Sequence, residues 1–218
     1  FDNVGSSVRS RVASLNLSDG TVSSWNPTAG GDITAMEVAG SVVYLGGWFN
    51  SMNGSTRYGI AAVNATTGAT TGWNPDNRSY TSGYYAAVTT IKAFGTKVYV
   101  GGPFTTIGGQ TRFHFARLDS TTAAANSWDP LIEDTPTTVF DDGTSVILGG
   151  YTSVVGVSYR ESLSAITISS GTLSTWNPNT VFWNRNEWEP ELSYVSKIIF
   201  SGSTLYVAGR FITINGVS

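Results

Sequence analysis

The sequence predicts an all-β protein, a β-propeller built from about four four-stranded blades of about 50 residues each. The prediction rests on a repeated spacing, on four short strand patterns in each repeat, and on the lack of helical periodicity in any segment of ten or more residues. Repeats of this length indicate stacked modules, each too small to bury a core alone.

The repeat consists of a Gly-Gly pair, an arginine ten residues after its second glycine, and a tryptophan sixteen residues after the arginine. Three units keep this spacing, and the chain opens inside another such unit. We expect the arginines to satisfy loop carbonyls beside an aromatic ring and the tryptophans to pack between blades. The alternatives are four anion sites and four ligand cages. The residues are Arg9, Arg57, Arg112 and Arg160, with Trp25, Trp73, Trp128 and Trp176.

The first two strands of each unit form a predicted hairpin. In the first strand apolar and polar residues alternate. The second strand is almost wholly apolar, which indicates that this strand is buried on both faces. A glycine-containing turn joins them, and glycine supplies the positive φ that tight hairpin turns need. The predicted first strands include 33–36, 88–91 and 195–198, and the second strands are 43–45, 98–100, 146–148 and 205–207.

The third and fourth strands follow the arginine. The third is predicted at 60–63 and 115–118, after a loop that carries Gly54 or Gly109. The fourth ends at Trp-Asn-Pro, or at Trp-Asp-Pro in the unit of Trp128, because proline cannot extend a ladder of hydrogen bonds.

Composition narrows the classes of function. Charged residues make up 12% of the chain and the net charge is −3, so we expect no nucleic-acid partner. No apolar stretch reaches the length that spans a bilayer, so no membrane insertion is expected. The lack of cysteine excludes disulfides and thiolate chemistry. A low-charge chain rich in Ser, Thr, Gly and Asn favours a secreted or cell-surface protein.

The pattern Tyr-Val-Gly-Gly-x-Phe, a glycine turn, Arg, a short strand and Trp-Asn-Pro resembles the delta-sixty type β-propeller repeat of bacterial proteins, and more loosely kelch units. The resemblance covers essentially the whole chain and implies a propeller, but says almost nothing of function. Thr152 departs from it, since Phe occupies the equivalent positions. The predicted units are 1–47, 48–102, 103–150 and 151–209, with 210–218 starting a further one.

The last residues repeat the register of the first, since 211–218 match 1–8. A closed ring of four units has no use for a second copy of this segment. We therefore expect a piece of a longer array or of a larger propeller, and closure into a small ring is the alternative. Open strand edges would favour self-association.

All variation in repeat length falls in the connection between a fourth strand and the next first strand. Two of these connections, 76–85 and 179–194, are long and rich in aromatic residues, which suits sugar stacking or a protein contact. The alternative is packing of the rings within their own loop. The expected ligand-binding residues are Tyr80, Tyr84, Tyr85, Phe182, Trp183, Trp188, Glu187 and Glu189.

No catalytic, metal or cofactor site is predicted. His114, the one histidine, aligns with Gly59 and has no neighbour suggesting a base or a metal. The loop carboxylates are expected to be solvated; they are Glu133, Asp134, Asp141 and Asp142.

The sequence favours a non-enzymatic extracellular or surface propeller that acts in adhesion, recognition or assembly, with a protein or a glycan as partner. One alternative is a carbohydrate-active enzyme, a glycoside hydrolase or lyase that uses loop carboxylates. The other is a structural subunit of a surface filament.

Overall fold

The computed structural model describes residues 1–77, 86–151, 154–178, 180–181, 194–211, 213–215 and 217 of the 218-residue chain. Every regular element in these residues is a β-strand, and every strand pair is antiparallel, which confirms the predicted all-β class. Among the described residues no helix is long and apolar enough to cross a membrane.

Three sheets of three strands share one topology, with the second strand of each in the middle. A C-terminal sheet contains two strands. The first sheet is β3 (Asp32–Ala39), β4 (Val42–Trp48) and β7 (Ile60–Asn64); the second is β8 (Thr90–Phe94), β9 (Lys97–Gly101) and β12 (Phe115–Asp119); the third is β13 (Pro136–Asp141), β14 (Ser145–Gly150) and β17 (Leu163–Thr167); the C-terminal sheet is β19 (Tyr194–Ser201) and β20 (Thr204–Arg210).

Pairs of two-residue strands form the remaining elements. Four of them are hairpins in the part of the repeat that the sequence analysis assigned to a loop, because strands this short show no periodicity. The hairpins are β1 (Asn3–Val4) with β2 (Ser7–Val8), β5 (Ser51–Met52) with β6 (Ser55–Thr56), β10 (Thr106–Ile107) with β11 (Gln110–Thr111), and β15 (Val154–Val155) with β16 (Ser158–Tyr159); β18 (Thr180–Val181) pairs with β21 (Thr213–Ile214).

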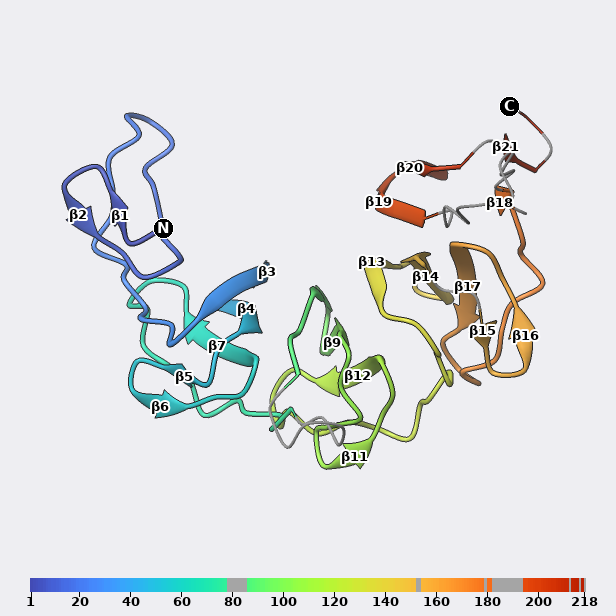
Figure 1. Cartoon of the computed structure of the whole chain (residues 1–218), viewed down its shortest axis with the longest axis horizontal. Coiled ribbons are helices and arrows are strands. Elements are labelled where there is room, and N and C mark those ends of the chain that lie inside the picture. The colour runs from blue at the N-terminus through green and yellow to red at the C-terminus, as the bar shows by residue number, and fades with distance from the viewer. Residues whose placement is uncertain are drawn as a thin grey trace, which may run out of the picture.

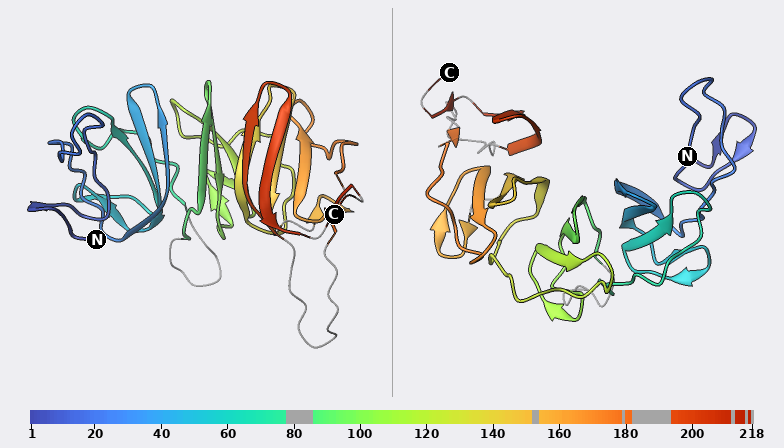
Figure 2. Two further views of the ribbon diagram at one scale, coloured as in Figure 1. Left: turned by 90° about the horizontal axis from the view of Figure 1, so that it is seen from above. Right: turned by 180° about the vertical axis from the view of Figure 1, so that it is seen from behind.

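The sheets follow one another around an open arc (Figure 1). Strands β3, β13 and β19 lie on the concave side, and the hairpins β5–β6 and β15–β16 lie on the convex side. Neighbouring first strands contact each other from β3 through β8 and β13 to β19. The two ends of the chain lie at opposite tips of the arc, as the views in Figure 2 also show.

The predicted first hairpin is confirmed in all four sheets. Its turn residues Gly40, Gly95, Gly143 and Gly202 have φ values of 57°, 58°, 91° and 60°. The middle strands β4, β9 and β14 are buried over almost their whole length, because a neighbouring sheet covers each face.

The predicted fourth strand is wrong in its extent. It is a single bridge in each unit: Val63–Thr70, Leu118–Ala125, Ile166–Leu173 and Leu15–Val22. The Thr71 N–H still donates to the Ala62 carbonyl at 2.9 Å, and side-chain bonds then begin. For example, the hydroxyl of Thr71 donates to the Ala62 carbonyl at 3.1 Å and accepts from the Trp73 N–H at 3.2 Å. Such local bonds compete with a ladder and end it early.

Each sheet packs on the next through a tryptophan. The indoles of Trp25, Trp73 and Trp128 are buried, and each Nε1–H donates to a carbonyl at the end of the third strand of the following sheet. For Trp73 the acceptor is Asp119, at 3.0 Å. The ring of Tyr44 meets that of Trp73 edge-on at 5.0 Å. One side chain therefore supplies apolar area and a directed bond at each junction.

A left-handed residue follows the repeated arginine by two positions in four units. In the three units with a complete sheet, its carbonyl accepts a hydrogen bond from the second glycine of the Gly-Gly pair, as Gly59 does from Gly47 at 3.0 Å. The equivalent residues are Arg11, Gly59, His114 and Ser162, with φ values of 68°, 66°, 61° and 56°.

At Gly59 the lack of a side chain is also a steric requirement, because an added Cβ would collide with the Ala86 carbonyl and the Asn77 amide. We predict that Gly59→Ala lowers the free energy of unfolding by at least about 1 kcal/mol more than Gly40→Ala does. Gly40 is the matched control, since it has a similar φ in open space. Equal losses in urea unfolding would contradict the described packing.

The expectation that Asp141 is solvated is wrong. Its carboxylate is buried at the end of β13, where it accepts from the hydroxyl of Tyr99 at 2.8 Å and from Nζ of Lys97 at 3.0 Å. Burial, and then the hydrogen bond to Asp141, raises the pKa of Tyr99. The sequence shows Asp141 beside a turn, but the strand continues to this residue.

We predict that Tyr99→Phe lowers the free energy of unfolding by about 1–3 kcal/mol, because the buried carboxylate of Asp141 loses a donor. Tyr44→Phe is the control, at the same place in the first sheet, where among the described residues the hydroxyl donates to no carboxylate. Thermal or urea unfolding measures both variants. A loss for Tyr44→Phe as large as that for Tyr99→Phe would contradict this account.

Candidate functional site

The eight predicted ligand-binding residues lie outside the described residues: Tyr80, Tyr84, Tyr85, Phe182, Trp183, Glu187, Trp188 and Glu189. Around the first segment, the structure describes the chain up to Asn77 and again from Ala86. Around the second, it describes the chain up to Val181, except for residue 179, and again from Tyr194. Both segments therefore lead into a first strand, β8 or β19. These two strands occupy equivalent places in the arc.

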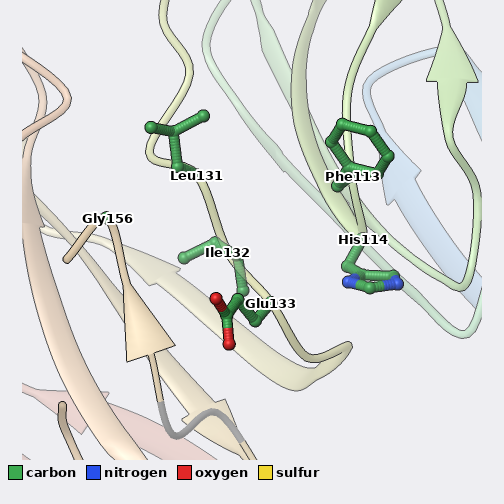
Figure 3. Close-up of a pocket in the computed structure, with 6 residues that line it drawn as sticks. All are labelled: Phe113, His114, Leu131, Ile132, Glu133 and Gly156. Atoms are coloured by element: carbon green, nitrogen blue, oxygen red, sulfur yellow. The ribbon is translucent and has the colours of Figure 1, made fainter. Parts of the chain in front are cut away.

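The same connection is short between the second and third sheets, and here it lines a pocket of about 260 Å³ (Figure 3). Leu131, Ile132 and Glu133 come from the connection itself. Phe113 and His114 face them from the segment that leads into β12, and Gly156 is in the turn of the β15–β16 hairpin. The pocket is thus built by two consecutive repeats.

His114 lies one residue before β12. Its backbone is held in the left-handed region because its carbonyl accepts from Gly102 at 3.0 Å and its N–H donates to Phe104 at 3.2 Å. The imidazole Nδ1 is buried and has no hydrogen-bond partner among the described residues. A buried polar atom without a partner is a group that a ligand can satisfy.

The opposite wall is held by an aspartate turn. The carboxylate of Asp129 accepts from the Leu131 N–H at 3.2 Å and lies 3.3 Å from Nη1 of Arg112. Leu131 has a φ of 53°, which directs the chain around the pocket. The side chain of Ile132 is buried at the base, and those of Leu131 and Glu133 are exposed.

The pocket residues Phe113 and Leu131 are absent from the candidates that the sequence analysis named. An alignment of the repeats singles out Leu131, because this residue is apolar, whereas the polar residues Thr28 and Asp76 occupy the equivalent positions in other units. Phe113 is exposed just before the third strand.

The repeated arginines bond to loop carbonyls. Arg57 donates to Thr56 at 2.8 Å and to Thr71 at 2.9 Å, and Arg9 and Arg112 make the same pair of bonds in their units. Arg160 donates to Tyr159 at 3.0 Å. Among the described residues, it is a different arginine that lies over an aromatic ring, Arg117, 4.8 Å from the ring centre of Trp128.

Chemically, the site offers apolar walls, one imidazole and one carboxylate. Among the described residues, no hydrogen bond or ion pair joins His114 to Glu133. No group of three residues able to hold a metal ion occurs in the described part of the chain. This lining suits the binding of a partly apolar, partly hydroxylated group better than acid–base chemistry.

The comparisons with known proteins address the fold. Residues 97–121 match a family described as a domain of unknown function (DUF5122) beta-propeller, which supports a β-propeller repeat. No curated protein matches the chain. The crystal structure of the computationally designed Ika8 protein is 14% identical, with a TM-score of 0.45, over 82% of this chain and 42% of that one. The designed Ika4 protein is 13% identical, with a TM-score of 0.45, over 83% of this chain and 91% of that one.

We predict that Arg112→Lys lowers the free energy of unfolding by about 1–3 kcal/mol, because a lysine cannot span the carbonyls of Thr111 and Asn126. Asp129→Asn is the control and should cost less than about 1 kcal/mol, since Asn74 and Asn177 occupy this place in other units. Urea unfolding checks both. A larger loss of stability for Asp129→Asn than for Arg112→Lys would show that the ion pair, and not the hydrogen bonds to the carbonyls, holds this wall of the pocket.

Proposed function

We propose that the chain is part of a bacterial β-propeller of the delta-sixty type that recognises glycans, outside the cell or at its surface, without catalysing a reaction. In this proposal each three-stranded sheet with its bridged fourth segment is one blade, and the chain contributes about four blades. The binding face is the rim where the connections lead into the first strands.

The observation that carries the proposal is the pocket of Phe113, His114 and Leu131 on this rim. A pyranose ring has apolar C–H faces and polar hydroxyl groups. The half-exposed ring of Phe113 and the side chain of Leu131 can cover such a face, while Nδ1 of His114 and the carboxylate of Glu133 can bond the hydroxyls.

The position of the pocket adds support. It lies at a short connection between a fourth strand and the next first strand. The two long connections of the same kind carry the aromatic residues, so by register all three connections belong to one rim. Variable loops on a fixed scaffold are the usual place of binding residues. The low charge of the chain fits a neutral ligand.

The enzyme alternative has less support in the pocket. Glycoside hydrolysis ordinarily needs two carboxyl groups on either side of the scissile bond. Of the six residues that line the pocket, Glu133 is the one with a carboxylate. A protein partner at the same rim is the other outcome that the test below distinguishes.

We predict binding of the full chain to at least one polysaccharide on an array of immobilised bacterial and plant glycans. Phe113→Ala and the double variant Trp183→Ala/Trp188→Ala should each weaken that binding about tenfold or more. Val8→Ala is the control, because Val8 is exposed on a different hairpin, β2.

Three outcomes would contradict the proposal. If no glycan on the array is bound, a protein partner is favoured. If both tested variants bind as well as the unaltered chain, the rim is not the binding site. If soluble sugars are released over time, the enzyme alternative is favoured.

A further inference from the structure

Two junctions of the arc share one framework: the first junction, between the first and second sheets, and the second junction, between the second and third. Both join complete three-stranded sheets. In each, a tyrosine of the middle strand meets the repeated tryptophan edge-on. The ring centres lie 5.0 Å apart for Tyr44 and Trp73, and 6.0 Å apart for the equivalent pair. That equivalent pair is Tyr99 and Trp128.

The second junction contains a cation. The guanidinium of Arg117, on the third strand β12, lies 4.8 Å from the ring centre of Trp128. Its Nη1–H donates to the Ile168 carbonyl at 3.3 Å. Burial and the bond to Asp141 raise the pKa of Tyr99, and the nearby charge of Arg117 opposes them. This place in the repeat therefore holds a guanidinium group between an indole ring, a carbonyl and a tyrosine.

The first junction has an alanine in place of this arginine. Ala62 lies two residues before the end of β7, as Arg117 lies two residues before the end of β12. The carbonyl equivalent to that of Ile168 belongs to Ser120, and no hydrogen bond to it is made within the described residues. The first junction thus keeps the indole ring and the acceptor, and it lacks the group that joins them in the second.

The small side chain of Ala62 leaves a pocket of about 260 Å³ at the first junction. Tyr44, Ala62 and Trp73 are buried in its wall, and Gly72 and Thr121 are exposed at its mouth. Pockets that enclose a whole small molecule measure about 300–1,000 Å³. This pocket therefore suits a single functional group of a larger ligand.

The charge at the pocket favours a cation. The carboxylate of Asp119 accepts from two backbone N–H groups of the following turn, at 2.7 and 2.9 Å, and these bonds lower its pKa. Burial, and then the charge of Asp119, raises the pKa of Tyr44, so the field of this carboxylate reaches the pocket wall. Across the same junction Glu37 and Lys92 pair at 2.7 Å and balance each other.

We propose that this pocket binds the guanidinium group of an arginine side chain from a partner protein. The group lies over the ring of Trp73 and donates to the Ser120 carbonyl, as Arg117 does to the equivalent carbonyl at the second junction. The hydroxyl of Tyr44, which has no hydrogen-bond partner in the described part of the chain, accepts a further N–H. Asp119 supplies the opposite charge. A lysine fits less well, because its compact ammonium lacks the planar face and the forked donors of a guanidinium.

This pocket is separate from the proposed glycan site. Phe113 and His114 come before β12, whereas Ser120 and Thr121 follow it. The two pockets therefore lie at opposite ends of the same strand, and a glycan on one rim leaves the other rim free for an arginine. The failure of either proposal leaves the other intact.

NMR of the chain with isotope-labelled tryptophan tests the site. We expect the blocked peptide acetyl-Gly-Arg-Gly-amide to shift the indole N–H signal of Trp73 saturably, with a Kd of about 1–10 mM. The same peptide with citrulline, which has the shape of arginine without its charge, should bind at least about tenfold more weakly. Free L-arginine that binds more tightly than the peptide would overturn a partner protein as the source.

Ala62→Arg fills the pocket from within the chain. It should abolish the saturable shift of Trp73 and keep the chain folded, because Arg117 occupies the same place in the next unit. Ala69→Arg is the matched control, since it adds the same charge at an exposed position of the same unit. The control should bind the arginine peptide as the unaltered chain does. A shift that persists in Ala62→Arg would overturn the proposal.

Arg117→Ala gives a second test that does not depend on the folding of Ala62→Arg. This change opens the equivalent pocket at the second junction, so the arginine peptide should then shift the indole N–H signal of Trp128 as well. A shift at Trp128 in this variant without one at Trp73 in the unaltered chain would overturn the proposal. Equal binding of the arginine and citrulline peptides, or no saturable shift at either indole, would overturn it too.

Discussion

The structure depends on the contact that the repeated tryptophan makes between consecutive sheets. A sheet of three short strands cannot bury both faces by itself, and it is stable only when a neighbour covers each face. The tryptophan supplies a large apolar ring for that cover and fixes the relative position of the sheets through its indole N–H. For Trp128 the acceptor is Thr167 in the next sheet, 3.3 Å away. The arc and its rim follow from repeating this junction.

Much of the fold is predictable from the sequence because its signals are local. The apolar run at 43–45 predicts a strand covered on both faces, and Gly40 predicts the turn before it; both are present in the structure. The fixed distance between arginine and tryptophan predicts equivalent units, and the bonds of Arg57 to the carbonyls on either side of its loop give a physical reason for that distance. The short hairpins and the reduced fourth strand are not predictable in this way, since two-residue ladders and single bridges have no periodicity.

The candidate site is less predictable for a different reason. The sequence analysis searched for unusual composition and therefore selected the aromatic connections, whose residues lie outside the described part of the chain. The pocket of Phe113 and Leu131 uses ordinary residues that two repeats bring together across a junction. Asp141 shows the same limitation, because only the packing of β9 against β13 makes it a buried acceptor for Tyr99. Contacts between sheets combine residues far apart in the sequence, and a single sequence contains no record of which pairs meet.

The most direct test of this account is hydrogen exchange of the indole N–H groups, followed by NMR of the chain with labelled tryptophan. Burial and a carbonyl acceptor predict slow exchange at Trp25, Trp73 and Trp128, at a rate that tracks global unfolding. Rapid exchange at these three indoles under native conditions would contradict the junction on which the whole architecture is built.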